Sequence, residues 1–227
     1  MNILIIFRLT VLLSFLSLPS FVHASVIPFI NEIHYDNEGS DLDEGVEIAG
    51  EAGFDLNGWS LELYNGLGGA SYGTIPLSGI FPNAQNGYGT IFFPYLSGIQ
   101  NGSPDGLALI DPLSQVTQFL SYEGIFSSVG GPADGMMSVD IGVEESSSTP
   151  IGYSLQLAGK GKFYEDFNWD QPSAATLGLL NANQIFISSD LSSDPSSNGG
   201  AVIPEPGSLS LLGLGFLGLI MKRRKLA

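Results

Sequence analysis

The chain has 227 residues, which is room for one domain of ordinary size with tails. It has no cysteine, which excludes disulfides, thiolate metal sites and cysteine nucleophiles. Its 23 acidic and 7 basic residues give a net charge of −16, which argues against nucleic acid as a partner. The 30 glycines, 13 prolines and 14 phenylalanines favour short strands and tight turns, so we predict an all-β fold.

Residues 1–24 have the features of a signal peptide. Arg8 precedes the apolar run Leu9–Phe15, and Val22-His23-Ala24 has the pattern that signal peptidase recognises. Pro19 and Ser20 keep the apolar run shorter than the roughly 20 residues of a membrane helix. We therefore predict export, with cleavage before Ser25.

Residues 25–187 contain short apolar runs separated by turn signals, and no sustained helical stripe. Two of the runs, Trp59–Leu63 and Tyr153–Leu157, alternate apolar and polar residues, so each should bury one face and expose the other. The turn signals are Asn65-Gly66, Asn86-Gly87, Asn101-Gly102 and Asp105-Gly106. The predicted strands are Val26–Tyr35, Val46–Ala49, Trp59–Tyr64, Thr90–Pro94, Leu107–Ile110, Val116–Tyr122, Met136–Ile141, Tyr153–Leu157 and Tyr164–Trp169. This spacing predicts a β-sandwich or barrel.

Three stretches of this region, Asn31–Asn37, Glu44–Gly50 and Asp55–Leu61, resemble the strands that open a lamin-tail domain. Asn101–Leu109 and Phe119–Gly124 resemble the bacterial secreted form of the same family. The resemblance implies an immunoglobulin-like β-sandwich over residues 25–187, with Trp59 and Trp169 in or beside its core. The chain departs from the family at Gly45, where a large aromatic residue is usual.

The segment Glu32–Glu62 contains ten carboxylates and no basic residue. Such density is costly unless the side chains spread into water or share a cation. Oxygen ligands suit calcium, and the candidate ligands are Asp36, Glu38, Asp41, Asp43 and Glu44. The loop is not an EF-hand, because its sixth position is Asp41 where that motif requires glycine. A calcium site and a solvated acidic loop both remain open, and we expect no other cofactor.

Candidate catalytic residues are few. His34, the one histidine after the signal peptide, has Glu32, Asp36 and Glu47 as expected neighbours, and it is either a ligand or base or a strand residue near carboxylates. Gly69–Gly73 matches the G-x-S-x-G pattern around Ser71, but a hairpin loop explains its glycines. Gly213–Gly218 matches a dinucleotide pattern by chance, since no βαβ unit can follow it. We therefore expect no enzymatic activity.

The C-terminal part has three distinct segments. Ser188–Ile203 is rich in serine, glycine and aspartate and is typical of a flexible linker. Leu209–Met221 is apolar, and the basic cluster that follows it predicts a membrane segment with that end in the cytoplasm. The cluster is Lys222, Arg223, Arg224 and Lys225.

Ahead of this segment stand Pro204, Glu205 and Pro206, and residues 204–227 together resemble a PEP-CTERM protein-sorting signal. The resemblance implies processing by an exosortase and a link to exopolysaccharide or biofilm production. We expect a non-enzymatic binding or structural module at the cell surface or in the matrix, with exopolysaccharide or another envelope protein as its partner. The alternatives are a small extracellular hydrolase acting through carboxylates or a metal, and a surface protein that stays anchored by one membrane span.

Overall fold

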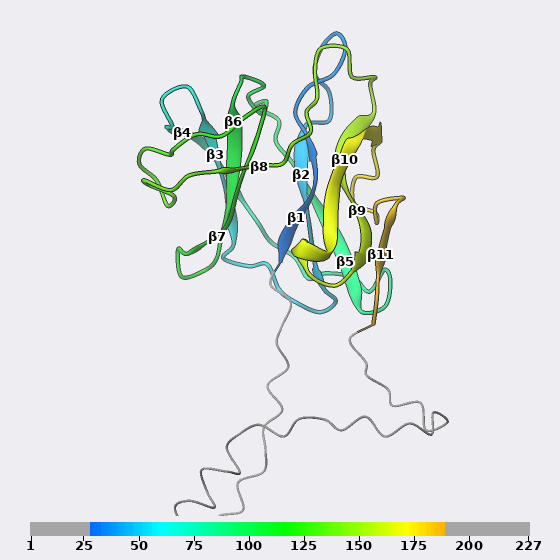
Figure 1. Cartoon of the computed structure of the whole chain (residues 1–227). Coiled ribbons are helices and arrows are strands. Elements are labelled where there is room, and N and C mark those ends of the chain that lie inside the picture. The colour runs from blue at the N-terminus through cyan, green and yellow to red at the C-terminus, as the bar shows by residue number, and fades with distance from the viewer. Residues whose placement is uncertain (1–27, 189–227) are drawn as a thin grey trace, which may run out of the picture. The chain divides into compact units, whose positions relative to one another are not determined.

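The computed structural model describes residues 28–188, which form two β-sheets and one 3₁₀ turn, η1 (Tyr164–Asp166) (Figure 1). The first sheet has the order β10-β9-β1-β2-β5 with β11 beside β9, and the second has the order β4-β3-β6-β7-β8. The first sheet consists of β1 (Phe29–His34), β2 (Gly45–Glu51), β5 (Tyr88–Pro94), β9 (Tyr153–Gly161), β10 (Phe167–Ala174) and β11 (Gln184–Phe186). The second consists of β3 (Ser60–Asn65), β4 (Ser71–Pro76), β6 (Asp105–Ile110), β7 (Val116–Tyr122) and β8 (Val139–Asp140). The predicted all-β fold is confirmed.

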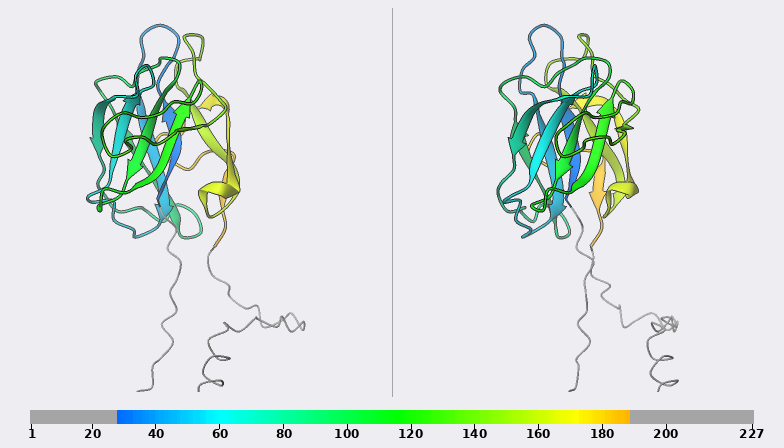
Figure 2. Two further views of the ribbon diagram at one scale, coloured as in Figure 1. Left: turned by 60° about the vertical axis from the view of Figure 1, so that its left-hand side comes forward. Right: turned by 90° about the vertical axis from the view of Figure 1, so that its left-hand side faces the viewer.

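The main core lies between the two sheets, which pack as layers (Figure 2). Ile33 of β1 and Ile48 of β2 belong to the same buried cluster as Leu61 of β3 and Leu107 of β6. Trp59 is buried in this core, and Trp169 packs against it, as the resemblance implied. The alternation of Trp59–Leu63 therefore has the expected result, with its apolar residues inside.

Several runs differ from their predicted form. Tyr153–Leu157 does not expose its polar face, because Ser154 and Gln156 are as buried as the leucines. The chain around residues 174–181 covers that face: Gln156 Nε2 donates to the Ala174 carbonyl at 2.8 Å. Of Met136–Ile141 only Val139 and Asp140 form a strand. The predicted strand at Tyr164–Trp169 begins instead with η1 and continues as β10.

Two strands were not predicted. β4 is an edge strand whose sequence, Ser71–Pro76, has no alternating apolar pattern, and β11 is only three residues long. Asp105-Gly106, predicted to be a turn, lies inside β6. Asn86-Gly87 is a tight turn, as predicted, since both residues have positive φ and Gln85 pairs with Tyr88 across it.

The departure from the lamin-tail pattern at Gly45 has a local reason. A Cβ atom there would lie 2.5 Å from the ring of Phe92 on the neighbouring β5. The Phe92 ring therefore occupies the space that a side chain on β2 would need.

The signal peptide, nearly all of the linker and the C-terminal apolar segment lie outside the described residues. Within residues 28–188, no helix combines the length and hydropathy of a membrane span.

Candidate functional site

His34 is buried on β1 with an acceptor at each ring nitrogen. Nδ1 lies 2.9 Å from Glu145 Oε1, and Nε2 lies 2.9 Å from the carbonyl oxygen of Leu42. Burial lowers the pKa of His34, but the hydrogen bond and charge of Glu145 outweigh it, so the pKa is raised overall. Because a carboxylate and a carbonyl oxygen face the two ring nitrogens, the site favours the imidazolium form, which donates to both and ties the acidic loop to the sandwich.

The carboxylate of Glu145 holds the end of β1. Its Oε2 accepts the backbone N–H groups of Tyr35 at 2.6 Å and Asp36 at 3.0 Å. The Tyr35 hydroxyl accepts the Glu145 N–H at 2.8 Å and donates to Glu123 at 3.1 Å. The Glu145 carboxylate is thus buried with three hydrogen-bonded partners, which are the His34 ring and two backbone N–H groups, and this is a structural arrangement.

Sequence reasoning missed Glu145. It expected Glu32, Asp36 and Glu47 beside His34, yet the partner comes from a loop 111 residues further along the chain. No spacing rule connects a strand residue with a loop residue at that distance, and Glu145 stands among serines with no apolar pattern around it.

The acidic loop after β1 is organised by Asn37. Its Nδ2 donates to the carbonyl oxygens of Glu38 and Ser40, both at 2.9 Å, and its Oδ1 accepts the Leu42 N–H at 3.1 Å. The Asn37 N–H donates to Asp41 Oδ1 at 3.3 Å. The side chain of Asn37 therefore supplies the hydrogen bonds that close the turn.

The five predicted calcium ligands lie in different environments. Asp36 is buried, and the carboxylate of Glu44 accepts the N–H of Ile99. Burial raises the pKa of Asp36 and of Glu44, and the charge of Asp41 raises both further. The remaining predicted ligands are exposed: Glu38, Asp41 and Asp43. Within the part of the chain that the structure describes, no three His, Asp or Glu side chains form a group that could hold a metal ion.

Two further carboxylates, Glu32 and Glu47, are buried opposite each other on β1 and β2. Glu32 accepts the Thr176 N–H at 2.9 Å and its hydroxyl at 2.8 Å. Glu47 accepts the Gly178 N–H at 2.7 Å and Asn31 Nδ2 at 2.8 Å. The pair therefore fastens the chain after β10 across the first sheet.

Burial raises the pKa of Glu47 to about 8, and the charge of Glu32 adds to the effect. The pKa of Glu32 is also raised by burial, against the hydrogen bonds from Ser154 and Thr176. Two ionised carboxylates side by side in a buried site repel each other, so each raises the pKa of the other and the pair favours holding a proton.

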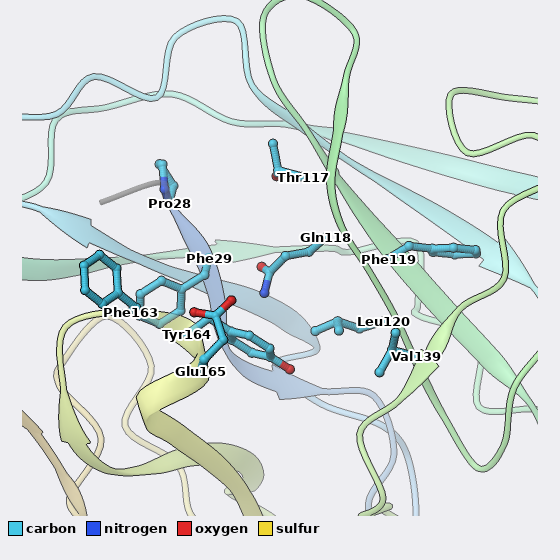
Figure 3. A pocket seen from close by; sticks show the side chains of 10 residues that line it. All are labelled: Pro28, Phe29, Thr117, Gln118, Phe119, Leu120, Val139, Phe163, Tyr164 and Glu165. Carbon is cyan, nitrogen blue, oxygen red and sulfur yellow. The ribbon is translucent and has the colours of Figure 1, made fainter. Parts of the chain in front are cut away.

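A cleft of about 460 Å³ opens between the start of β1, β7, β8 and η1 (Figure 3). Aromatic residues from three elements line it: Phe29 from β1, Phe119 from β7, and Phe163 and Tyr164 at η1. The rings of Phe29 and Tyr164 lie 6.1 Å apart between centroids. Figure 3 shows Gln118 directed into the space between these rings and β7. This is the candidate ligand site of the domain.

Gln118 joins the two sheets at the floor of the cleft. Its Oε1 accepts the Ile30 N–H at 2.8 Å, and this bond fixes which end of the amide is the oxygen. Its Nε2 is buried and has no hydrogen-bond partner within residues 28–188. Buried donors are rarely left unpaired, so this N–H group is an exception among the buried polar groups of the described residues.

Ser71 does not have the surroundings of a nucleophile. It opens β4, and its hydroxyl donates to the carboxylate of Glu62 on β3. Residues 66–70 form the hairpin between those strands, which is the interpretation that the glycines favoured. Gly213–Gly218 lies outside the described residues.

The comparison with family models matches residues 202–225 to the PEP-CTERM protein-sorting motif. No curated protein and no solved structure matches the chain. The match covers Pro204, Glu205 and Pro206, the apolar segment and the basic cluster, so the predicted sorting signal is confirmed. The protein carries the signal of an exported protein that an exosortase sorts to the cell envelope or surface.

Proposed function

We propose that this protein is a non-enzymatic binding or structural module of the cell surface or extracellular matrix, delivered there through its exosortase signal. The observation that carries the proposal is the sorting motif at residues 202–225 on a chain whose described part is one two-layer β-sandwich. We assign that sandwich to the immunoglobulin-like, lamin-tail-like type on the strength of the strand resemblances described above.

The side chains with catalytic potential support a non-enzymatic role. Both ring nitrogens of His34 are engaged by Glu145 and Leu42, so the ring is not available as a base. The hydroxyl of Ser71 donates to Glu62, and the one imidazole within residues 28–188, that of His34, is bound to Glu145 instead. The cleft, by contrast, is lined by aromatic side chains and by the amide of Gln118, which are residue types common in ligand-binding sites.

The proposed route begins with signal peptidase at Ser25 and ends with exosortase at the Pro-Glu-Pro motif. Exopolysaccharide or an envelope protein is the proposed partner at the destination. The membrane takes part through residues 209–221, transiently if the tail is removed and permanently if it is kept.

Fractionation of the native host tests this route. In wild-type cells we expect the protein on the surface or in the medium, where protease added to intact cells digests it. Replacing Pro204, Glu205 and Pro206 by alanine should leave it in the inner membrane. The matched control is Asp194→Ala in the linker, which should be exported like the wild type. Equal surface display of the wild-type protein and the motif variant would contradict the proposal.

A further inference from the structure

The cleft beside β1 presents aromatic faces to its opening. Phe163 lines the cleft and is 46% exposed, so part of its apolar surface is left for a ligand to cover. With the half-buried Tyr164 it forms an aromatic wall on one side of the cleft, and the buried Phe29 packs against Tyr164 behind that wall. Such a wall binds a flat ligand face composed of C–H groups.

The polar groups of the cleft are few and have defined roles. Gln118 has a buried, unpaired N–H donor at the floor, since its oxygen already accepts the Ile30 N–H. The Tyr164 oxygen accepts the Trp169 Nε1–H at 3.0 Å, so its own hydrogen can be donated to a ligand. Glu165 is exposed and supplies an acceptor. A ligand that fits must therefore both donate and accept hydrogen bonds.

Charge restricts the ligand further. Residues 28–188 contain 20 acidic residues and only two basic ones, Lys160 and Lys162. Glu165 is the one charged side chain that lines the cleft. The field of the domain therefore repels anionic ligands such as uronate polymers or phosphate esters. It places no such penalty on an uncharged one.

From these three features, and resting on the proposed function as a binding module, we infer that the cleft binds one sugar ring of a neutral polysaccharide. A pyranose has a C–H face for the aromatic wall and edge hydroxyls that donate to Glu165 and accept from Gln118. A purely apolar chain would leave Gln118 Nε2 unpaired. The cleft volume of about 460 Å³ lies within the range of small-molecule sites. Because Nε2 is buried, contact between it and the sugar requires a side-chain rearrangement at the cleft floor.

Titration of the full-length protein in phosphatidylcholine nanodiscs, followed by saturation-transfer NMR, tests the inference. The probes are the neutral pentasaccharides cellopentaose, maltopentaose and mannopentaose, with pentagalacturonate as an anionic probe of equal length. We expect at least one neutral probe to bind with millimolar affinity and pentagalacturonate not to bind. Binding by none of the neutral probes, or by pentagalacturonate alone, would overturn the inference.

Two variants locate the binding. Phe163→Ala removes an exposed ring at the cleft and should weaken the affinity about tenfold, or about 1.4 kcal/mol. Its control is Tyr153→Ala, an aromatic residue of comparable exposure that does not line the cleft. Gln118→Glu keeps an acceptor for the Ile30 N–H while removing the donor, and should weaken the affinity similarly. Thermal melts of each variant establish that it is folded.

If both cleft variants bind as the wild type does, the sugar binds elsewhere and the assignment of the cleft is wrong. Failure of the proposed function has a different signature. A protein that stays full-length in the inner membrane contradicts export whether or not its cleft binds sugar.

Discussion

Glu32 and Glu47 face each other across β1 and β2, and neither side chain is exposed to water. Together they accept backbone N–H groups of Thr176 and Gly178. The protonation of these two carboxylates therefore affects the hydrogen bonds that hold residues 176–178 on the first sheet.

The domain should lose stability as pH rises from about 5 to about 8. The pKa of Glu47 is about 8 in the folded state and 4.5 as its ordinary value. A group whose pKa is higher in the folded than in the unfolded state contributes its full stabilisation at pH values below the unfolded-state pKa. That contribution is lost as the pH rises through the folded-state pKa. The slope should reach about 1.4 kcal/mol per pH unit. Urea unfolding between pH 5 and 9 measures it.

Glu47→Gln should flatten this dependence, because the amide cannot ionise. The raised pKa of His34 acts in the same direction, so some slope will remain. Glu38→Gln, on the exposed part of the acidic loop, is the control and should keep the wild-type slope. Identical slopes for Glu47→Gln and the wild type would show that the buried pair does not govern the pH dependence.

Removing the carboxylate of Glu145 should be severe. Glu145→Ala leaves the His34 charge and the N–H groups of Tyr35 and Asp36 without their acceptor in a buried site. Breaking such a pair costs about 3–5 kcal/mol. Chemical denaturation measures the loss, and the adjacent exposed Glu144→Ala should be nearly neutral. Equal stabilities for these two variants would contradict the structural role of Glu145.

Calcium binding by the acidic loop stays a prediction of the sequence. The structure directs Asp41 Oδ1 and the Glu44 carboxylate toward backbone N–H groups of the protein. We therefore expect Ca²⁺ and Mg²⁺, at equal concentration and ionic strength, to change the melting temperature equally by screening charge. A larger shift with Ca²⁺ that Asp41→Asn abolishes would instead establish a specific site, since a ligand of the native state raises its stability.

β11 should owe its attachment to Phe186. This ring is fully buried and stacks on Tyr88 with centroids 4.8 Å apart. Phe186→Ala should cost about 3–5 kcal/mol through the cavity it creates. Ile185→Ala, at the half-exposed neighbouring position, should cost about 0.5 kcal/mol or less. Similar losses for both variants in denaturant unfolding would contradict this difference.

The parts of the fold that could be predicted are those that local sequence determines. Alternation places Leu61 and Leu63 in the core, and Asn86-Gly87 specifies its turn through positive φ. Predictions of exposure failed where a segment distant in sequence packs over a strand. Ser154 and Gln156 look solvent-facing in sequence, but the segment around residues 174–181 buries them. Burial of a polar strand face depends on a loop whose path no local pattern specifies.

The candidate site shows the same division. The sorting motif is contiguous, so its residues were identified from sequence. The cleft brings together Phe29, Gln118 and Phe163 from separate parts of the chain. The hydrogen bond from the Ile30 N–H holds the oxygen of the Gln118 amide, and this orientation leaves Nε2 without a partner within residues 28–188. Neither the grouping nor that bond has a signature in sequence.

The most direct test of the export route is the intact mass of the protein recovered from fractions of its own host. The account predicts a species in the envelope, on the surface or in the medium that begins at Ser25 and ends near Pro204. A species in the inner membrane that extends to Ala227 would contradict exosortase processing and would indicate a permanently anchored protein.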